Sequence, residues 1–336
     1  MVVEVMSRVR ARRRSRAAMS RIVSLLPSTT EICCAIGLAD QLVAVTHECD
    51  YPPAVASHPH VTRNVLPPGI SDGAEIDRLV TERLLEGGSI YELDVALLAE
   101  LAPDLILTQA LCEVCAVAYE DVLSIARRLP GHPRVASIDP HTLEEILESI
   151  LVVGRLAGRP DTAGAVVSAL RLRLAHLAER LGPTAHRPRV VCLEWLDPPM
   201  VAGHWVPEMV ERAGGRDVLG RAGEPAFRVE WDAVRAAAPE VLVLMPCGYG
   251  LEATLDEVQR LLDRPGGWPP AGADIPAVAA GRVYGVDGSG YFNRPGPRVV
   301  DGVEILARIL HPEALASTGP PDAARPVAPR AVESPR

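Results

Sequence analysis

Two loops of this chain carry side chains of the kinds that bind metal ions. One loop contains His47 and Cys49, and the other contains Cys112 and Cys115. Imidazole and thiolate groups are preferred ligands of Zn²⁺. If the strands that precede these loops are neighbours, the four side chains could converge on one zinc ion. They could also pack as inert buried groups, because a single C-x2-C pair is a weak metal signal.

The same loops would supply a general base to a zinc-dependent enzyme. Glu48 follows His47 directly, and Glu113 lies between the two cysteines of the second loop. Either carboxylate could activate a zinc-bound water. Motifs of other enzyme classes are missing from the sequence: no G-x-G-x-x-G follows a predicted strand, and neither G-x-x-x-x-G-K-[ST] nor G-x-S-x-G occurs. A zinc-dependent enzyme or metal-ion protein is therefore one hypothesis.

Aromatic side chains could instead bind a large, flat ligand. They make up only 4% of the chain, yet all four tryptophans lie in its second half. Trp195 and Trp205 lie close to His204, and indole faces suit flat apolar surfaces. For any single tryptophan, a place in the core is about as common. Both uses of these residues stay open at this point.

One long helix, predicted over Pro160–Leu181, must position these loops. Pro160 suits a first helical position, apolar residues then recur at steps of three and four, and Gly182 ends the pattern. Similar segments lie on both sides of the helix: Ala-Pro-Asp-Leu-Ile-Leu at 102–107 and Ala-Pro-Glu-Val-Leu-Val at 238–243. This repeat predicts two similar lobes with a cleft between them.

Strands that alternate with helices predict parallel sheets covered on both faces. We therefore expect an α/β fold of two similar lobes with central, mainly parallel sheets, joined by one long rigid linker helix. The predicted strands are 21–26, 41–46, 104–108, 134–138, 189–194, 241–245 and 282–286. The expected divisions are a disordered basic leader (1–20), an N-terminal lobe (21–158), the linker helix (159–182), a C-terminal lobe (183–312) and a disordered tail (313–336).

Ligands of such sheets bind beyond the carboxyl ends of the strands. That rule selects the loops at 27–31, 47–53, 109–116, 195–205, 246–251 and 287–297. The candidate ligand-contacting residues in these loops are Ser28, Thr29, His47, Glu48, Trp195, His204, Trp205, Tyr249, Tyr291 and Phe292. The candidate metal ligands, beside His47, are Cys49, Cys112 and Cys115.

Composition limits the partners and the location of the protein. The 34 basic and 43 acidic residues give a net charge of -9, which argues against nucleic-acid or anionic-membrane binding. No apolar run is long enough to insert into a membrane. No apolar segment of a secretory signal follows the arginine-rich first twenty residues, and seven cysteines fit a reducing compartment. These features predict a cytoplasmic protein, or an extracytoplasmic one if the true start differs.

Two segments resemble a known family. Ile-Val-Ser-Leu-Leu-Pro-Ser-Thr-Thr-Glu at 22–31 and His-Glu-Cys-Asp-Tyr-Pro-Pro at 47–53 look like the cobalamin-binding branch of the class III substrate-binding proteins of ABC importers. The two lobes, the linker helix and the repeated Ala-Pro segments are similar to that family as well. The resemblance covers roughly residues 20–312.

The resemblance implies a non-enzymatic protein that binds a corrinoid such as cobalamin between its lobes and requires no other cofactor. His47 or His204 would approach the metal or the side-chain amides of the ligand. A siderophore or haem binder is a further alternative, because the same family includes both. The resemblance also implies docking to an ABC permease through Glu92 and Glu230. Family members with one linker helix close little on binding, so specificity should lie in preformed loops.

Overall fold

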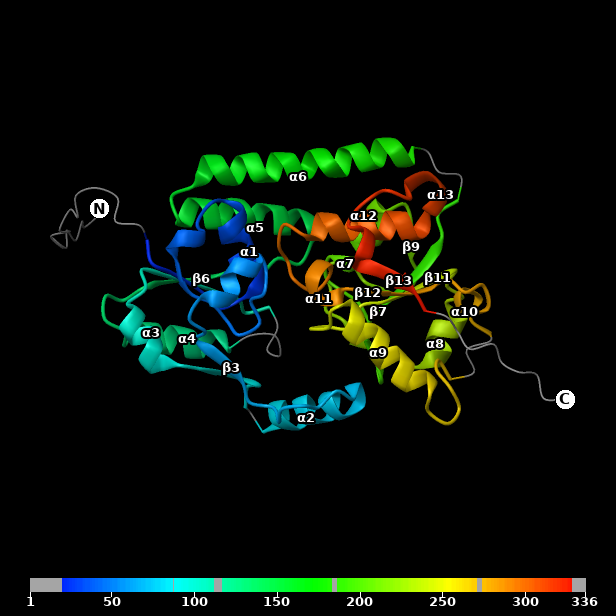
Figure 1. Ribbon diagram of the computed structural model, residues 1–336, viewed down its shortest axis with the longest axis horizontal. Helices are drawn as coiled ribbons and strands as arrows, with labels where there is room; N and C mark the ends of the chain where they lie inside the picture. The colour runs from blue at the N-terminus through cyan, green and yellow to red at the C-terminus, as the bar shows by residue number, and fades with distance from the viewer. Residues whose placement is uncertain (1–19, 87, 112–116, 183–185, 271–273, 328–336) are drawn as a thin grey trace, which may run out of the picture.

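The long helix α6 (Pro160–Leu181) lies along both lobes of the molecule and has the bounds that the sequence predicts (Figure 1). The computed structural model describes residues 20–327 except 87, 112–116, 183–185 and 271–273. Helix α6 packs on α5 (Leu143–Leu156) through a close approach at Gly154, where an added Cβ would come 2.4 Å from the Cβ of Ala163. At its other end, Arg173 forms ion pairs with Asp301 and Glu304 of α12. One helix is thus fastened to both lobes.

The N-terminal lobe is built on four parallel strands in the order β2-β1-β5-β6. Helices cover both faces of this sheet. Successive side chains of a strand point to opposite faces, so each strand packs against helices on both sides. Leu105 and Leu107 pack with α1 and α5, whereas Ile106 packs with α3 and α4. The elements of this sheet and its helices are β1 (Ile22–Ser24), α1 (Pro27–Ala35), β2 (Leu42–Ala44), α3 (Val95–Leu101), β5 (Leu105–Thr108), α4 (Tyr119–Ala126) and β6 (Arg134–Ser137).

The C-terminal lobe has its own mixed sheet in the order β10-β8-β7-β11-β12-β13, with β9 paired to β7. Strands β7, β11 and β12 are parallel, and antiparallel strands flank them. Helices α7 and α12 pack on one face, and α8, α9 and α10 on the other. The elements are β7 (Arg189–Leu196), β8 (Pro199–Val201), α7 (Val206–Arg212), β9 (Arg216–Asp217), β10 (Phe227–Arg228), α8 (Trp231–Ala236), β11 (Val241–Leu244), α9 (Leu251–Leu262), α10 (Pro276–Ala279), β12 (Val283–Val286), α11 (Gly288–Tyr291), α12 (Val299–Leu310), α13 (Pro312–Leu315) and β13 (Ala324–Pro326).

The two sheets are separate, so the α/β fold with two lobes and one linker helix is confirmed. The expectation of a disordered tail from residue 313 is wrong for 313–327. Within that range α13 forms, and β13 pairs antiparallel with β12. Proline- and alanine-rich composition concealed a strand whose partner is distant in sequence. Residues 1–19 of the expected leader and 328–336 of the expected tail lie outside the described residues.

The segment between β2 and β5 contains two strands that are absent from the predicted set, whereas its helix α2 (Gly73–Leu85) agrees with a helix expected over 74–86. Strands β3 (Thr62–Asn64) and β4 (Tyr91–Leu93) pair antiparallel, and α2 lies between them in sequence. Asp72 caps α2 by accepting a hydrogen bond from the Glu75 amide at 3.1 Å. In the described part of the chain, no helix is both long and apolar enough to span a membrane.

A buried carboxyl group lowers the stability of the C-terminal lobe at neutral pH. Asp217 accepts hydrogen bonds from the amides of Leu219 and Gly220 at 3.0 and 2.6 Å, but its Oδ2 is buried without a partner among the described residues. Burial is the main cause that raises the pKa of Asp217 to about 6, and the two amides oppose it. Because the folded state holds this proton more tightly, stability falls as the pH rises from about 4 to about 6.

We predict that Asp217→Asn stabilises the protein at pH 8 and changes little at pH 4. The amide keeps an acceptor for Leu219 and Gly220 but removes the buried charge, a gain of roughly 1–3 kcal/mol above pH 6. Thermal unfolding at the two pH values measures this difference. An equal effect at both pH values would show that the charge is not responsible.

Candidate functional site

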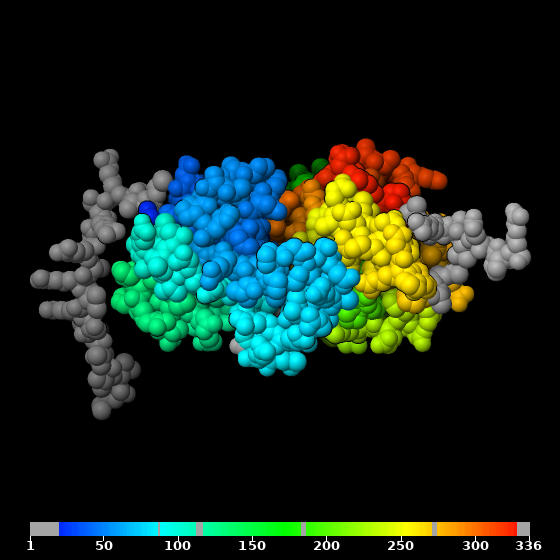
Figure 2. Space-filling view, turned by 60° about the horizontal axis from the view of Figure 1, so that its bottom comes forward, coloured from blue at the N-terminus to red at the C-terminus, as the bar shows by residue number. Residues whose placement is uncertain are grey.

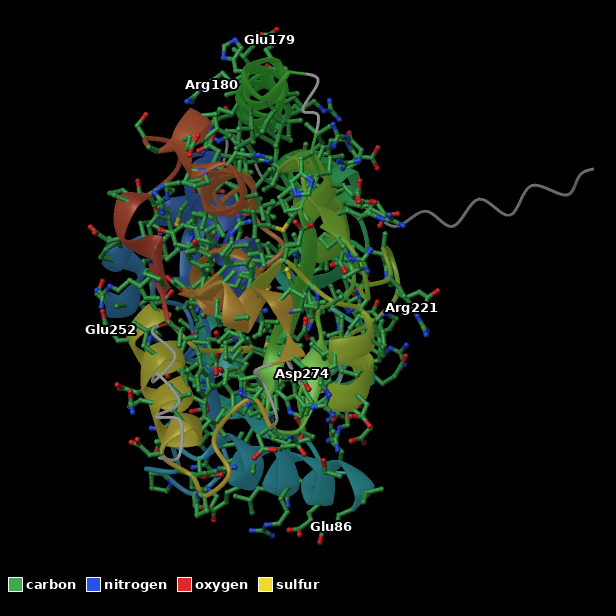
Figure 3. All side chains as sticks on the ribbon, turned by 90° about the vertical axis from the view of Figure 1, so that its right-hand side faces the viewer. Glu86, Glu179, Arg180, Arg221, Glu252 and Asp274 are labelled. Atoms are coloured by element: carbon green, nitrogen blue, oxygen red, sulfur yellow. The ribbon has the colours of Figure 1, made fainter. Side chains whose placement is uncertain are left out.

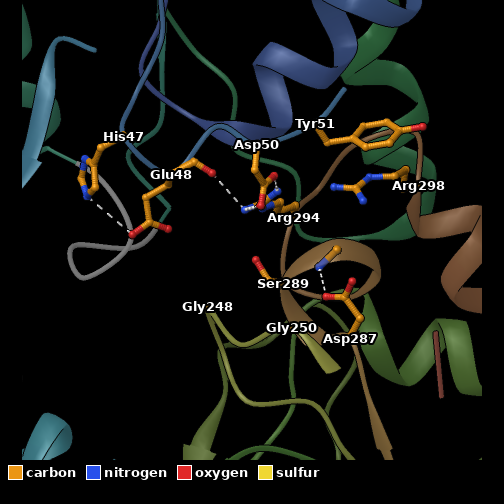
Figure 4. Close-up of a pocket in the computed structure, with 11 residues that line it drawn as sticks. His47, Glu48, Asp50, Tyr51, Gly248, Gly250, Asp287, Ser289, Arg294 and Arg298 are labelled. Atoms are coloured by element: carbon orange, nitrogen blue, oxygen red, sulfur yellow. Dashed lines mark hydrogen bonds and ion pairs between the residues drawn. The ribbon is translucent and has the colours of Figure 1, made fainter. Parts of the chain in front are cut away.

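A cavity of about 500 Å³ lies between the lobes, at the carboxyl ends of β2, β11 and β12. Three of the predicted loops meet there: 47–53 from the N-terminal lobe and 246–251 and 287–297 from the C-terminal lobe. Figure 4 shows these loops facing each other across the cavity. Its lining residues are His47, Glu48, Asp50, Tyr51, Gly248, Gly250, Asp287, Ser289, Gly290, Arg294 and Arg298.

Beneath the cavity, a buried carboxylate of one lobe binds an arginine of the other. Glu31 of α1 is only 4% exposed. Arg298, at the start of α12, donates to it from Nε and Nη2 at 2.9 and 2.5 Å. Burial raises the pKa of Glu31, while the charges of Arg298 and Arg294 oppose that rise. Because two N–H groups of Arg298 bind the two carboxylate oxygens of Glu31, the orientation of the ion pair is fixed.

A second arginine connects the lobes beside this pair. Arg294 is 9% exposed and binds the Asp50 carboxylate at 2.5 Å and the Glu48 carbonyl oxygen at 3.0 Å. Its Nη1 also lies 3.5 Å from Oε1 of Glu31. We call Glu31, Asp50, Arg294 and Arg298 the inter-lobe network. Since it joins two residues of each lobe, it holds the two walls of the cavity at a fixed separation.

Tyr51 presents an aromatic ring at the cavity wall. The guanidinium carbon of Arg298 lies 4.0 Å from the centre of the Tyr51 ring and 5.4 Å from that of Tyr291. Tyr51 is 44% exposed, so part of its surface is available to a ligand. Stacking on the arginine fixes the orientation of the ring. The exposed part of this ring therefore offers a preformed contact surface.

His47 and Glu48 form the opposite edge of the cavity. His47 Nδ1 lies 2.8 Å from the Thr62 hydroxyl, and its Nε2 lies 3.7 Å from a Glu48 oxygen. The Tyr91 hydroxyl donates to the same Glu48 oxygen at 3.1 Å. Burial lowers the pKa of His47 despite the nearby carboxylate, so the ring is neutral at pH 7. His47 Nε2 is buried and has no hydrogen-bond partner in the described part of the chain.

Several other candidate ligand-contacting residues lie behind the cavity rather than in its wall. Thr29 is fully buried and its hydroxyl pairs with that of Ser24 at 2.6 Å, while Ser28 is 3% exposed. The Ser28 backbone lies against Gly296, which brings the arginine loop close to α1. Tyr291 lies beside Arg298, whose guanidinium carbon is 5.4 Å from the centre of the tyrosine ring. These residues position the site and do not line it.

The expectation that Trp205 and Phe292 stack on a ligand does not fit their burial. They are 4% and 0% exposed, and the Trp205 indole donates to the Phe292 carbonyl oxygen at 2.7 Å in the core. The N-terminus of α7 lies beneath α12, which covers both rings. His204 stacks on Trp205 at 5.5 Å and faces His141 at 5.9 Å, away from the residues that line the cavity.

Trp195 and Tyr249 lie next to the cavity on the C-terminal lobe. Their rings contact edge to face, with centroids 5.6 Å apart. Tyr249 lies between Gly248 and Gly250, which line the cavity. At either glycine an added Cβ would meet no atom within 4 Å, so the backbone itself borders open space. A ligand can approach the chain closely at this point.

The cysteines give no metal site among the residues that the structure describes. The Cys49 sulfur lies 3.2 Å from the hydroxyls of both Thr30 and Thr46, and burial raises the pKa of its thiol. Cys112 and Cys115 lie outside the described residues. Within the described ranges, no three His, Cys, Asp or Glu side chains are grouped to hold a metal ion. The zinc site with Cys112 and Cys115 stays a prediction.

The two predicted docking glutamates are exposed, one on each lobe. Glu92 lies in β4 and forms an exposed ion pair with Arg63. Glu230 lies at the start of α8. Their exposure is compatible with docking, which itself remains untested.

Sequence reasoning missed the inter-lobe network, although one signal for it was present. Glu31 precedes the apolar residues of a helix that packs into the core, and a charge is rarely buried without a partner. The partners Arg294 and Arg298 lie more than 260 residues away along the chain. Only the three-dimensional structure could identify them.

We predict that Glu31→Gln lowers the free energy of unfolding by roughly 3 kcal/mol, because it leaves Arg298 buried without its counter-charge. The matched control is Arg171→Gln, which breaks an exposed ion pair with Glu144 between α6 and α5 and should cost at most about 1 kcal/mol. Urea unfolding of both variants measures the difference. Similar small losses would show that the network contributes little to stability.

Comparisons with known proteins extend over most of the chain. A family model described as periplasmic binding protein matches residues 22–289. The chain is 23% identical over 293 residues to a vitamin B12-binding protein of Vibrio cholerae, covering 86% of this chain and 88% of that protein. It is 25% identical over 305 residues to an uncharacterized ABC transporter substrate-binding lipoprotein of Bacillus subtilis, covering 87% and 80%.

Solved structures share the fold. The periplasmic vitamin B12 binding protein of Vibrio cholerae matches with a TM-score of 0.62 at 23% identity, covering 87% of this chain and 96% of that one. The apo form of a periplasmic heme-binding protein from Roseiflexus sp. RS-1 matches with a TM-score of 0.65 at 24% identity, covering 88% and 99%. Both comparisons support the two-lobe architecture.

The expected cytoplasmic location is wrong, because the matching family is periplasmic and the relatives include a lipoprotein. The cysteine count was a poor guide to the compartment. Cys33 and Cys192 are fully buried, and burial raises the pKa of both thiols. Both are therefore protected from oxidation even outside a reducing compartment. The match to residues 22–289 shows that this chain belongs to the periplasmic binding protein family.

Proposed function

We propose that this protein is a non-enzymatic substrate-binding protein of an ABC importer and that it binds a corrinoid such as cobalamin. The observation that carries the proposal is the preformed cavity between the lobes, whose walls are connected by the inter-lobe network. A cavity with rigid walls suits a large ligand that binds without closure of the lobes. The similarity to vitamin B12-binding proteins supports the same ligand class.

The charges at the cavity favour a ligand without net negative charge. The carboxylates of Glu48, Asp50 and Asp287 line it, whereas both arginines in its wall are engaged by carboxylates. No free cationic side chain among these lining residues is available to bind an anion. An anionic ferric siderophore would therefore meet repulsion. A corrinoid carries many neutral amide groups, which can donate to these carboxylates and accept from Ser289.

Three features suit the flat body and the edge groups of a corrinoid. The exposed Tyr51 ring supplies an apolar face. Gly248 and Gly250 leave room for the ligand to approach the backbone. The His47 ring lines the cavity and is neutral at pH 7, so it adds no charge at this edge. In this proposal the predicted contacts of His47 and Glu48 are retained, and Tyr51, Asp50 and Ser289 are added.

Docking to a permease completes the proposed role. Glu92 and Glu230 lie exposed on different lobes, as a partner that contacts both lobes at once would require. We propose these two carboxylates as docking points for an ABC permease. The non-enzymatic role is consistent with membership of a binding-protein family.

Haem is the second candidate, because heme-binding proteins share this fold and a tyrosine hydroxyl could ligate iron at Tyr51. We predict that cyanocobalamin binds to the purified protein more tightly than haemin or a ferric siderophore. Calorimetry with the three ligands provides the measurement. Tighter binding of haemin or of the siderophore would contradict the corrinoid assignment.

Variants of Tyr51 distinguish the two modes of binding. If the ring packs on a corrinoid, Tyr51→Ala should weaken cyanocobalamin binding about tenfold and Tyr51→Phe should leave it nearly unchanged. If the hydroxyl ligates haem iron, Tyr51→Phe should abolish the absorbance band that is specific to tyrosine-ligated haem. Loss of cyanocobalamin binding in both variants would argue against a contact through the ring face.

A further inference from the structure

Helix α2 leaves the N-terminal lobe and reaches the C-terminal lobe on the side opposite α6. Figure 1 shows α6 along one side of the molecule and α2 along the other, with both lobes between them. Figure 3 shows the same opposition, with Glu179 of α6 and Glu86 after α2 at opposite ends. In the space-filling view of Figure 2, the segment around α2 spans the front of the molecule from one lobe to the other.

The contacts of this helix with the C-terminal lobe are polar. Arg228 donates to both oxygens of Asp77 at 2.7 and 2.9 Å. Arg264 binds Asp72 at 2.8 Å and also Asp197. We call the Arg228–Asp77 and Arg264–Asp72 pairs the latch. Each pair joins one residue of the α2 segment to one residue of the C-terminal lobe.

Two further hydrogen bonds reinforce the latch at the N-terminus of α2. Arg260 donates to the Ser71 carbonyl oxygen at 2.5 Å, and Glu257 accepts from the Gly73 amide at 3.2 Å. An added Cβ at Gly73 would come 2.5 Å from the Glu257 carboxylate and 3.7 Å from the Trp195 ring. Only glycine permits this close approach.

The apolar side chains of α2 are not packed into the protein core. Ile76, Val80 and Leu84 share with Asp77 the side of the helix that faces the lobes, as helical geometry requires. They remain partly exposed, and the described core clusters contain none of them. The attachment of α2 therefore rests on the latch and its hydrogen bonds. The arginine side chains of both latch pairs are solvent-exposed, and ion pairs that water can reach contribute little stability, so they break readily.

The N-terminus of α2 lies close to the cavity. Gly73 lies near Trp195, which packs on Tyr249, and the neighbours of Tyr249 line the cavity. The cleft is closed on the opposite side by α5, α6 and α12, which connect the lobes. On the other side, α2 is the element that crosses from one lobe to the other (Figures 1 and 2).

We infer that α2 is a releasable strap across the mouth of the cleft, and that a large ligand enters and leaves only when the latch is broken. This inference rests on the proposed function, because it assigns the route of the ligand into the same cavity. The strap supplies the movement that the rigid lobes lack. Ligand exchange should become faster at high salt, since salt weakens exposed ion pairs.

The test is the rate of cyanocobalamin binding and release in the double variant Asp77→Asn, Arg228→Gln. Both rates should rise about fivefold, as expected for loss of one exposed ion pair, while the affinity changes less than about twofold. The control is Arg78→Gln, which removes the Arg78–Glu82 ion pair within α2 and leaves the latch intact. Rates equal to those of the unmodified protein would overturn the inference.

Hydrogen exchange of the ligand-free protein tests the strap without any ligand. The amides of α2 should exchange several-fold faster in the double variant than in Arg78→Gln, while those of α5 and α6 stay unchanged. Equal exchange of α2 in the two variants would overturn the strap. If cyanocobalamin fails to bind but α2 exchange responds as expected, the proposed ligand is wrong and the releasable strap stands.

Discussion

A charge buried between two lobes is the constraint on which this structure depends. Glu31 is too deeply buried to remain ionised without partners, and its partners Arg298 and Arg294 belong to the other lobe. Removing one member would leave the others desolvated and unpaired, which costs several kcal/mol. Either lobe alone would expose this unmatched charge. The network therefore specifies how the lobes meet and sets the width of the cavity above it.

The remaining contacts between the lobes also hold the lobes in a fixed arrangement. Helix α6 is anchored to α12 by Arg173, and Glu208 of α7 accepts a hydrogen bond from the Leu143 amide at the start of α5. With the lobes held at several points, a ligand cannot be enclosed by a hinge motion of large amplitude. Specificity then depends on the loops that already face the cavity, and exchange depends on the weakly attached α2.

Sequence patterns within short segments predicted the fold well, because the formation of a helix or strand depends largely on residues that are close together in the sequence. Apolar periodicity and the flanking Pro160 and Gly182 defined α6, and buried apolar runs defined the parallel strands. The rule for parallel sheets also selected the loops that form the cavity. The particular side chains were harder to predict, because burial depends on distant partners. Trp205 follows a strand but lies under α12, whereas Arg294 and Arg298 contact Glu31 from more than 260 residues away along the chain.

A crystal structure of the protein with cyanocobalamin would test the central claim most directly. The account predicts that the corrin ring lies between the loops at 47–51 and 287–298, against Tyr51, with the Arg298–Glu31 and Arg294–Asp50 pairs unchanged from the structure described above. A ligand bound outside this cavity, or lobes rotated so that these pairs are broken, would contradict a preformed cleft held open by the inter-lobe network.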